Sequence, residues 1–386
     1  MHGIVLNIVL VLVVFVLYVH SFTISNGFLR SVVQRKLTAL KRYAPLFSTP
    51  AEYGAQSITV LEGLEPVRKR PGMYIGSTGS KGLHHLVYEV VDNSVDESLA
   101  GHCNEINVLL HSDNSVTVSD NGRGIPCEIH PSSGKSSLET VLCVLHAGSK
   151  FGGESSGYTV SGGLHGVGIS VVNALSEELN VTVVRDGKRH VMNFEKGVPV
   201  TALSMSPSVP VARRGTTIRF KPDVSIFKTD QIFDVNTLSR RFDELAYLNP
   251  GLKIVMMDER NHGQNVESES ASASESASTQ QRSTNTLSNT TAIEFKHDGG
   301  IAELVTELCK NKKNLHPSVP IISVQGAMKG VTVEVSLRWS EDSYSQENIA
   351  SFANNIRTGD GGSHVDGLKS AISKTVNQFA RKVATF

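Results

Sequence analysis

One segment of the sequence carries acidic and amide side chains at a spacing that could do chemistry. Residues 82–100, GLHHLVYEVVDNSVDESLA, predict an amphipathic helix. At about 100° per residue its apolar face consists of Leu83, Val87, Val90, Val91 and Val95. On the opposite face Glu89 is central, with Asn93 about 40° to one side and Asp96 about 20° to the other. A carboxylate can align a water molecule and an amide oxygen is a hard ligand for Mg²⁺, although a polar stripe on a helix is usually only a solvated face.

Two glycine-containing segments follow the predicted helix. A strand-like VTVS ends in DNGRGIP (120–126), a pattern that a polar surface loop could also supply. Residues 148–168 contain eight glycines and lead into ISVVNALS, a predicted helix. Glycines before a helix let backbone N–H groups approach phosphate oxygens, and a flexible surface loop is the alternative. Neither GxGxxG after a strand nor GxxxxGK[ST] is present, which disfavours the dinucleotide fold and the Walker-type P-loop.

The acidic helix, DNGRGIP and the glycine-rich segment occur in an order that resembles the GHKL ATPases. Four strings narrow the resemblance to the DNA gyrase B family: VRKRPGMYIG (67–76), LHHLVYEVVDNSVDESLAGHC (83–103), SGGLHGVGISVVNALS (161–176) and NNIRTGDGGSHVDGL (354–368). The likeness covers the chain from about Tyr53 onward, apart from one insert. It implies an α+β fold, in which a GHKL (Bergerat-type) ATPase α/β sandwich precedes an incomplete transducer domain of ribosomal-protein-like βαβ fold.

The resemblance also implies ATP and Mg²⁺ as cofactors and gives the candidate residues roles. Glu89 would be the general base that orients the attacking water, Asn93 would hold Mg²⁺, and Asp120 would accept a hydrogen bond from the adenine amino group. In the same pocket Arg123 would pair with Glu97 and lie against the adenine rim, the Thr216 hydroxyl would lie near adenine, and Arg185 would lie at the edge. The remaining implied nucleotide-binding residues are Asp96, Gly124, Ile125, Pro126, Lys150, Tyr158, Gly163, Leu164, His165, Gly166, Val167 and Gly168.

Simpler roles remain open for several of these side chains. Arg123 and Arg185 could form ordinary surface ion pairs, which contribute little. His165 could contact phosphate or merely pack. Asp92 and Asp96 could tune the general base or only hydrogen-bond nearby backbone.

The resemblance extends to partners. Tyr53 and Ile58 repeat the spacing of the gyrase arm residues that reach across a dimer, which implies homodimerisation through an N-terminal arm on ATP binding; a frayed terminus is the alternative. Gyrase A would be the partner protein and DNA the substrate of the full enzyme.

Three other functions are alternatives to that of a gyrase. The ATPase subunit of topoisomerase IV shares these motifs and is the nearest alternative. A GHKL chaperone or scaffold is disfavoured by the strings at 67–76 and 354–368, and a membrane-anchored sensor kinase by the lack of a phosphorylatable helix before the ATPase segment.

The first 51 residues differ in composition from the rest of the chain. Gly3 to Val19 is a run of 17 residues without charge, and residues 20–51 carry five basic and no acidic side chains. This pattern predicts a signal peptide followed by a transit peptide, which resembles the leaders of apicomplexan plastid (apicoplast) proteins that travel through the secretory pathway. A single-pass membrane anchor with a positive flank is the alternative, so contact with a membrane is expected only through the leader.

The net charge of the leader also differs from that of the rest of the chain. The chain has 37 Lys and Arg residues and 37 Asp and Glu residues. The leader contains five of the basic residues and none of the acidic ones, so the rest of the chain has 32 basic and 37 acidic residues and a net charge of −5. Bulk attraction to DNA is therefore not expected. The four cysteines, Cys103, Cys127, Cys143 and Cys309, have no metal-ligand spacing, so neither a zinc site nor a disulfide framework is indicated.

The predicted domains are a leader (1–51), the ATPase domain (52–297) and a partial transducer domain (298–386). Residues 262–291 contain 13 Ser or Thr in 30 positions and predict a disordered loop. This loop lies between the strand-like LKIVMMDE and IEFKHDGG, which places it on a surface hairpin. The sequence stops before the Gln-Thr-Lys loop and the acidic metal module of gyrases, so we expect a fragment or an incomplete gene model that hydrolyses ATP poorly. A steady-state rate equal to that of a version extended through the loop would refute this.

Overall fold

The computed structural model describes residues 60–148, 166–207, 213–227, 232–260, 291–341 and 348–384. The predicted leader, the arm residues Tyr53 and Ile58, most of the glycine-rich segment and nearly all of the Ser-rich insert lie outside these ranges. Residues 61–386 form one compact unit, which is described here. The predicted boundary between an ATPase and a transducer domain within it stays a prediction.

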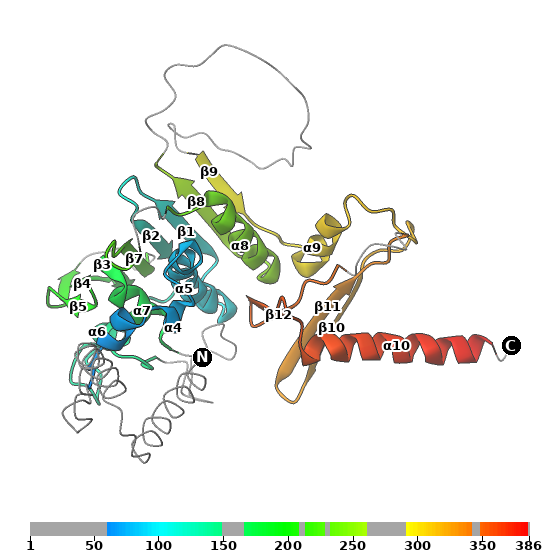
Figure 1. Ribbon diagram of the computed structural model, residues 1–386, viewed down its shortest axis with the longest axis horizontal. Helices are drawn as coiled ribbons and strands as arrows, with labels where there is room; N and C mark the ends of the chain where they lie inside the picture. Colours follow the sequence, from blue (N-terminus) through cyan, green and yellow to red (C-terminus); the bar gives the residue numbers. More distant parts are fainter. Residues whose placement is uncertain are drawn as a thin grey trace, which may run out of the picture. The chain divides into compact units, whose positions relative to one another are not determined.

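A nine-stranded mixed sheet forms the centre of the N-terminal part (Figure 1). Its order is β5-β4-β3-β7-β2-β1-β8-β9, with β6 paired to β4. Strands β1 and β8 run parallel and the other pairs are antiparallel. The strands are β1 (Glu105–Leu110), β2 (Val116–Asp120), β3 (Ser176–Arg185), β4 (Lys188–Glu195), β5 (Val198–Pro199), β6 (Ser204–Pro207), β7 (Gly215–Pro222), β8 (Lys253–Asp258) and β9 (Thr291–Phe295).

Helices cover one face of this sheet (Figure 1). Helices α5 (Ser80–Leu99), α7 (Gly168–Ala174) and α8 (Val235–Leu248) pack on the sheet, and α6 (Ser137–Cys143) contacts its β5 edge. Burial alternates along the strands, and in β1 the buried side chains are Ile106, Val108 and Leu110. Period-two burial means that one sheet face meets the helices and the other is more open. The predicted α/β sandwich is therefore confirmed. Two further short helices, α3 (Glu65–Lys69) and α4 (Gly72–Ile75), precede α5.

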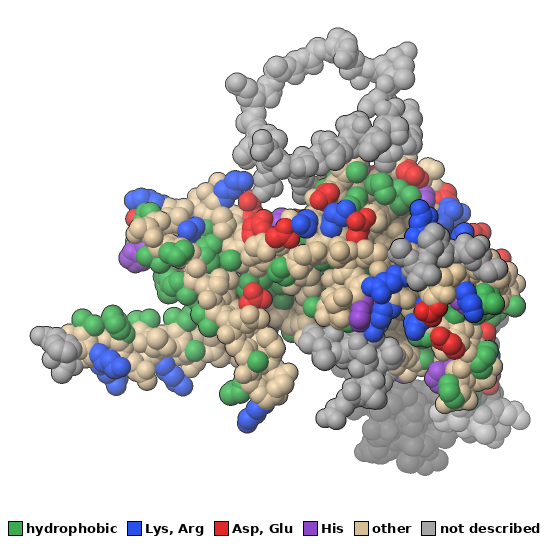
Figure 2. Space-filling view, turned by 180° about the vertical axis from the view of Figure 1, so that it is seen from behind, with side chains coloured by type: hydrophobic (Ala, Val, Ile, Leu, Met, Phe, Trp, Pro, Cys, Tyr) green, Lys and Arg blue, Asp and Glu red, His purple; other side chains and the backbone are tan. Residues whose placement is uncertain are grey.

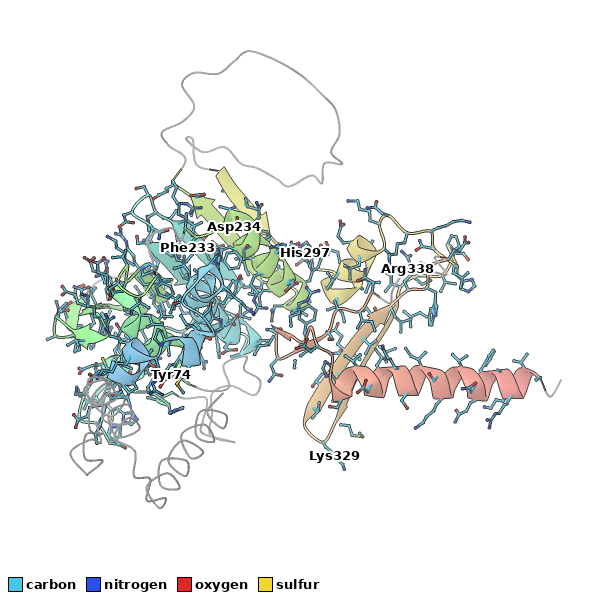
Figure 3. All side chains as sticks on the ribbon, in the orientation of Figure 1. Tyr74, Phe233, Asp234, His297, Lys329 and Arg338 are labelled. Carbon is cyan, nitrogen blue, oxygen red and sulfur yellow. The ribbon has the colours of Figure 1, made fainter. Side chains whose placement is uncertain are left out.

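Helix α5 agrees with the face predicted for residues 82–100. All five predicted apolar residues are at most 2 % exposed. The opposite face is not simply solvated, because Asp96 is only 1 % exposed. His84 is buried too and joins two helices: Nδ1 lies 2.6 Å from the Ser80 carbonyl oxygen, and the Asp234 backbone N–H donates to Nε2 over 2.7 Å. Asp234 in turn caps the first turn of α8, and Figure 3 labels it beside Phe233, whose ring meets His84 edge-on.

Strands β8 and β9 pair antiparallel at the sheet edge, with Asp258 opposite Thr291. This confirms the predicted hairpin on either side of the Ser-rich insert. The insert itself lies outside the described residues, except that the strand already begins at Thr291.

The C-terminal part begins with α9 (Gly300–Leu308), which His297 joins to α8. The His297 ring lies 2.8 Å from an Asp243 oxygen and 2.9 Å from a Glu303 oxygen, and it stacks on Tyr247; Figure 3 labels it between the two helices. Next come the hairpin β10 (Ile322–Met328) and β11 (Val331–Leu337), the short pair β12 (Phe352–Ala353) and β13 (Ile356–Arg357), and α10 (Ser363–Val383). Strand β11 confirms a strand within residues 331–340, although exposure does not alternate along it, because residues 331–334 are all exposed.

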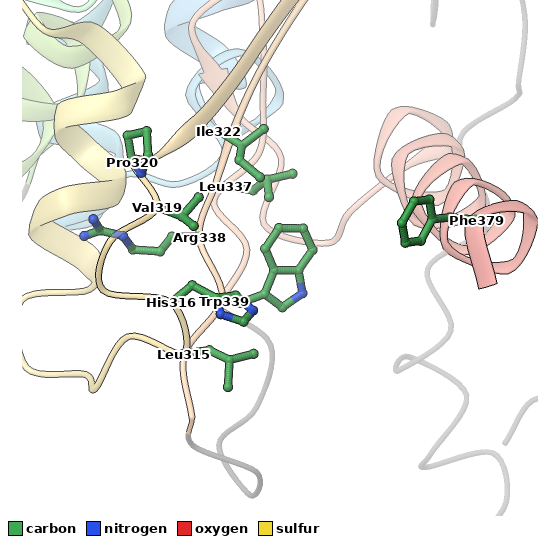
Figure 4. A pocket seen from close by; sticks show the side chains of 9 residues that line it. All are labelled: Leu315, His316, Val319, Pro320, Ile322, Leu337, Arg338, Trp339 and Phe379. Carbon is green, nitrogen blue, oxygen red and sulfur yellow. The ribbon is translucent and has the colours of Figure 1, made fainter. Parts of the chain in front are cut away.

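Much of this C-terminal part is exposed. On α10 the side chains of Val376, Phe379 and Val383 are 56 to 68 % exposed, and Figure 2 shows hydrophobic side chains along one edge of the helix and Lys and Arg along the other. An apolar cavity of about 500 Å³ lies in the same part (Figure 4). It is lined by Leu315, His316, Val319, Pro320, Ile322, Leu337, Arg338, Trp339 and Phe379.

The described ranges contain no helix long and apolar enough to cross a membrane. The same ranges contain no group of three His, Cys, Asp or Glu side chains placed to hold a metal ion. All four cysteines are free thiols.

Gly82 gives a first testable consequence of the packing at the start of α5. A Cβ atom at this position would lie 1.7 Å from the backbone oxygen of Ser77. Because a backbone atom cannot rotate away, Gly82→Ala should lower the free energy of unfolding by about 1–3 kcal/mol, measured by urea titration. Gly72→Ala is the matched control, since nothing lies within 4 Å of its Cβ position. Equal stability of the two variants would contradict this packing.

Asp223 gives a prediction on acid stability. Its carboxylate lies 2.6 Å from a guanidinium nitrogen of Arg68, which also donates to the Ala174 carbonyl. Burial alone would raise the pKa of Asp223, but hydrogen bonds from Ser225 and Arg68 outweigh it and hold the pKa below its ordinary value.

A lowered folded-state pKa means that the unfolded chain takes up the proton first as the pH falls. The stability due to the Asp223 carboxylate should therefore be complete above about pH 5, and be lost as the pH falls past about 4 toward the folded pKa. Urea titrations of wild type and Asp223→Asn should show their largest difference at pH 7 and a shrinking one in acid. A difference that stays constant or grows in acid would contradict the assignment.

Candidate nucleotide-binding site

Asp120 lies at the end of β2, where three donors hold its carboxylate. Oδ1 accepts the backbone N–H groups of Gly122 at 2.9 Å and Thr216 at 3.2 Å, and Oδ2 accepts the Ser94 hydroxyl at 2.9 Å. An ionised carboxylate has about four acceptor positions, so three donors leave room for one more. The residues around Asp120 therefore fit a ligand that offers an N–H group.

The electrostatic environment of Asp120 is that of a partly desolvated acid. Burial raises its pKa above the ordinary value, although the donors from Gly122, Ser94 and Thr216 oppose the shift. A carboxylate held away from water forms stronger hydrogen bonds than an exposed one. This environment suits recognition of a neutral donor rather than a cation at the surface.

The DNGRGIP loop after Asp120 is joined to α5, β3 and β7 by polar contacts. Arg123 binds both oxygens of Glu97, at 2.8 Å and 3.1 Å, and its backbone N–H donates to the same carboxylate. Arg185 donates to the Gly124 carbonyl at 3.1 Å, and the Ile125 N–H donates to the Thr216 hydroxyl at 3.3 Å. The predicted Arg123–Glu97 pair is confirmed. Arg185 and Thr216 lie beside the loop, and their place at the edge of a nucleotide pocket stays a prediction.

Gly124 is required by the close approach of this loop to β3. Its φ is +79°, and a Cβ atom would lie 2.9 Å from a methyl carbon of Val183. Ile125 packs on the core, whereas Pro126 is exposed. The backbone at this turn can therefore lie against the sheet while its outer edge faces solvent.

Glu89 lies against the start of α7. Its side chain is 29 % exposed, and one oxygen lies 3.1 Å from His85 Nε2, one helical turn earlier. A Cβ atom on Gly168 would lie 1.9 Å from Glu89 Oε2, so glycine at this position makes room for the carboxylate. The tertiary structure thus brings Glu89 to the C-terminal end of the glycine-rich segment.

Asp92 is another acidic group on this part of α5. Burial raises the pKa of Asp92 to about 6, against the opposing charge of Arg241. Arg241 donates to both Asp92 oxygens from α8, at 3.1 Å and 3.4 Å. The sequence predicted neither this pair nor the contact of Ser94 with Asp120. His85 could have been recognised from its i,i+4 spacing to Glu89, but Arg241 is 149 residues from Asp92 and carries no local signal.

The structure places only part of the predicted nucleotide-binding set. Gly166, Val167 and Gly168 are described, and Gly166 has a φ of +58°. Lys150, Tyr158, Gly163, Leu164 and His165, like Tyr53 and Ile58, lie outside the described residues. Their proposed contacts stay predictions.

Asn93, the predicted Mg²⁺ ligand, lies on α5 one turn after Glu89, and it is partly exposed. Mg²⁺ commonly takes only one or two protein ligands together with substrate phosphates and waters. A single amide oxygen near a glycine-rich segment fits that donor set. The chemistry of Asn93 is thus compatible with a metal that arrives with a phosphorylated nucleotide.

Comparisons with known families match two parts of the chain. Residues 78–226 match the family described as histidine kinase-, DNA gyrase B-, and HSP90-like ATPase, and residues 300–386 match the family described as DNA gyrase B. The first segment contains α5, the DNGRGIP loop and α7. The second covers the part from α9 onward.

Individual relatives of this chain are also DNA gyrase B proteins. A DNA gyrase B protein of Synechocystis sp. is 52 % identical over 86 % of this chain and 28 % of its own length. A chloroplastic/mitochondrial DNA gyrase B protein of Oryza sativa subsp. japonica is 50 % identical over 86 % of this chain and 42 % of its own. The chain therefore spans less than half the length of these relatives.

A solved structure gives the same result. The crystal structure of the 43K ATPase domain of Thermus thermophilus gyrase B, in complex with an aminocoumarin, superposes with a TM-score of 0.66 at 36 % sequence identity. The likeness covers 84 % of this chain and 74 % of that one.

Proposed function

This chain belongs to the DNA gyrase B family, and from that premise we propose that its α5–β2–α7 site binds ATP to operate a DNA clamp. The observation that carries the proposal is the Asp120 carboxylate, which is fixed by Gly122, Ser94 and Thr216 and retains room for one donor. Adenine offers such a donor in its amino group. Arg123, held by Glu97, would lie against the rim of the base.

The phosphate end of the nucleotide would lie toward α7. Glu89, which abuts Gly168, would orient a water molecule toward the γ-phosphate, and the glycine-rich segment ahead of α7 would supply backbone N–H groups. Phosphoryl transfer needs mainly positioning and charge stabilisation. Mg²⁺, when bound with the nucleotide, supplies charge neutralisation, and Asn93 would hold it. The other proposed contacts are those of Gly124, Ile125, Pro126 and Arg185 around the adenine ring, and of Lys150, Tyr158 and residues 163–168 over the phosphates. Asp96 is a further proposed residue of the site, where it would tune the general base or hydrogen-bond nearby backbone.

Calorimetric titration with a non-hydrolysable ATP analogue and Mg²⁺ tests the proposal. We expect saturable binding at one site per chain, abolished by an aminocoumarin added beforehand, because the related domain was solved with such a compound. Absence of analogue binding would refute the proposed function. Binding that an aminocoumarin does not affect would favour a GHKL chaperone or scaffold instead.

For the whole protein we propose gyrase A as the partner protein and DNA as substrate. Supercoiling by the enzyme reconstituted with gyrase A supports this proposal, whereas relaxation and decatenation alone would favour a topoisomerase IV ATPase. With a net charge of −5 beyond residue 51, local patches or the partner must supply the DNA contacts.

Two further proposals concern the N-terminal region. We propose that Tyr53 and Ile58 belong to an arm that exchanges between two copies when ATP binds. Light scattering with the analogue should show a dimer, and a species that stays monomeric would count against the arm exchange.

We also propose a plastid location of the apicoplast type through the leader, supported by organellar plant relatives. A fluorescent fusion to residues 1–51 that remained in the endoplasmic reticulum would favour the membrane anchor.

A further inference from the structure

Arg241 on α8 contacts two segments that are distant in sequence. One guanidinium nitrogen, Nη2, donates to the Asp92 carboxylate on α5 at 3.1 Å, and the other, Nη1, donates to the backbone carbonyl of Asn355 at 2.9 Å. The guanidinium carbon also lies 5.8 Å from the centre of the Tyr88 ring. The Arg241 side chain is 14 % exposed. A planar guanidinium with several fixed donors is suited to such a bridge, whereas the single ammonium of lysine is not.

The Asp92 end of this bridge lies at the proposed Mg²⁺ and water-positioning residues. Asp92 directly precedes Asn93 and is three residues after Glu89. Glu89 and Asp96 act on Asp92 as like charges, and Arg241 is the opposing cation. The Asp92 side chain is 25 % exposed, and a partly buried carboxylate that loses its cation is left uncompensated, so its side chain and the adjoining turn of α5 would move toward water or another donor.

The Asn355 end lies in the turn between β12 and β13. Asn354 and Asn355 have φ values of +47° and +68°, and the Asn355 side chain donates to Asn249 at 3.1 Å. The left-handed conformation of these two residues determines where the Asn355 carbonyl points. The turn therefore presents a fixed acceptor to Arg241.

We propose that Arg241 is a positioning residue that links the β12–β13 turn to the metal-binding side of α5. The Asn355 carbonyl orients the guanidinium, the guanidinium holds Asp92, and Asp92 holds the turn of α5 that presents Asn93 and Glu89. A change in the β12–β13 turn thereby alters how well Mg²⁺ is held with the nucleotide. This inference rests on the proposed ATP site.

The test measures the gain in affinity for a non-hydrolysable ATP analogue that Mg²⁺ supplies, by titrating the whole chain with and without the metal. In wild type the metal should increase affinity. Arg241→Lys keeps the charge but not the two-ended geometry, and it should reduce that gain about tenfold, with little change in affinity without metal. Arg240→Lys is the matched control, because Arg240 is the exposed neighbour on the same helix and its variant should behave as wild type.

A double-mutant cycle tests the chain of contacts. Asp92→Asn should reduce the metal-dependent gain by a similar factor, and the Arg241→Lys/Asp92→Asn double variant should lose no more than either single one, because residues that act through one contact are not additive. Additive losses would overturn the link between the two residues.

The turn is tested independently of Arg241. Asn355→Val places a β-branched residue at positive φ and should displace the carbonyl, which should lower the metal-dependent gain as Arg241→Lys does. Asn355→Gly retains both the conformation and the carbonyl and should leave the gain near the wild-type value. Equal behaviour of the two variants would overturn the role of the turn.

The outcomes separate the two proposals. A wild-type chain that binds no analogue refutes the ATP site itself. A wild-type chain with a metal-dependent gain that Arg241→Lys retains in full overturns the positioning role and leaves the ATP site standing. A merely structural Arg241 would lower thermal stability in the variants without changing the metal-dependent gain, and that result also overturns the inference.

Discussion

Replacing Asp120 by asparagine is expected to weaken binding of an ATP analogue roughly a hundredfold, by about 3 kcal/mol. The amide oxygen of the variant can still accept the N–H groups of Gly122 and Thr216, which now meet Oδ1. Its NH₂ group then replaces Oδ2, so that a donor faces the adenine amino group and the acceptor is lost. Calorimetry on the wild type and the variant measures the difference.

The fold itself should tolerate this change. Because burial raises the pKa of Asp120, the structure does not favour the ionised form, and a neutral amide should leave thermal unfolding close to that of wild type. Asp113→Asn is the control, since Asp113 lies in the β1–β2 turn, where it pairs with Arg219. Similar losses of affinity in both variants, or none in Asp120→Asn, would show that adenine does not bind at Asp120.

Replacing Glu89 by glutamine should separate binding from hydrolysis. The amide has nearly the same shape but does not act as a general base, so single-turnover hydrolysis of ATP should fall by roughly 10²- to 10⁴-fold. Affinity for the analogue should change little, because the expected contribution of Glu89 is to the attacking water and not to the bound nucleotide. Single-turnover conditions detect this even where the wild-type rate is low.

Gly168→Ala should also reduce ATP hydrolysis, because Gly168 on α7 lies against the Glu89 carboxylate. The new Cβ would lie 1.9 Å from Glu89 Oε2, and because a carboxylate at the end of a flexible side chain can rotate away, the main loss should be in hydrolysis and not in stability. Gly148→Ala is the matched control within the glycine-rich segment, since nothing lies within 4 Å of its Cβ position. Hydrolysis that survives in both Glu89→Gln and Gly168→Ala would exclude Glu89 as the base.

Some features of the site follow from local sequence alone. The apolar positions of α5 recur at helical spacing, so the side chains that face the sheet could be identified from that spacing, and this placed Glu89, Asn93 and Asp96 together on the other face. The hairpin of β8 and β9 was predictable in the same way, because two strand-like segments border a Ser-rich insert that cannot bury apolar surface. The order of these segments resembled one family strongly enough to suggest the role of each residue.

Other features depend on contacts that no local pattern encodes. Arg241 reaches Asp92 from 149 positions away, and the Thr216 backbone donates to Asp120 across 96. Such pairs form only because the sheet order places β7 beside β2 and because α8 packs beside α5. The packing of α5 on the sheet likewise buries Asp96, which helical spacing alone placed only on the polar face of that helix.

The sequence by itself therefore determined which residue types are available and on which face of each element they lie, because helical and strand periodicities are local properties of the chain. Only the tertiary structure decided which of them meet. It surrounded the Asp120 carboxylate with three donors, brought Glu89 against Gly168, and joined α5 to the β12–β13 turn through the Arg241 guanidinium. The physical reason is that burial and hydrogen-bond partners are set by how the elements pack, and that packing is a property of the whole fold.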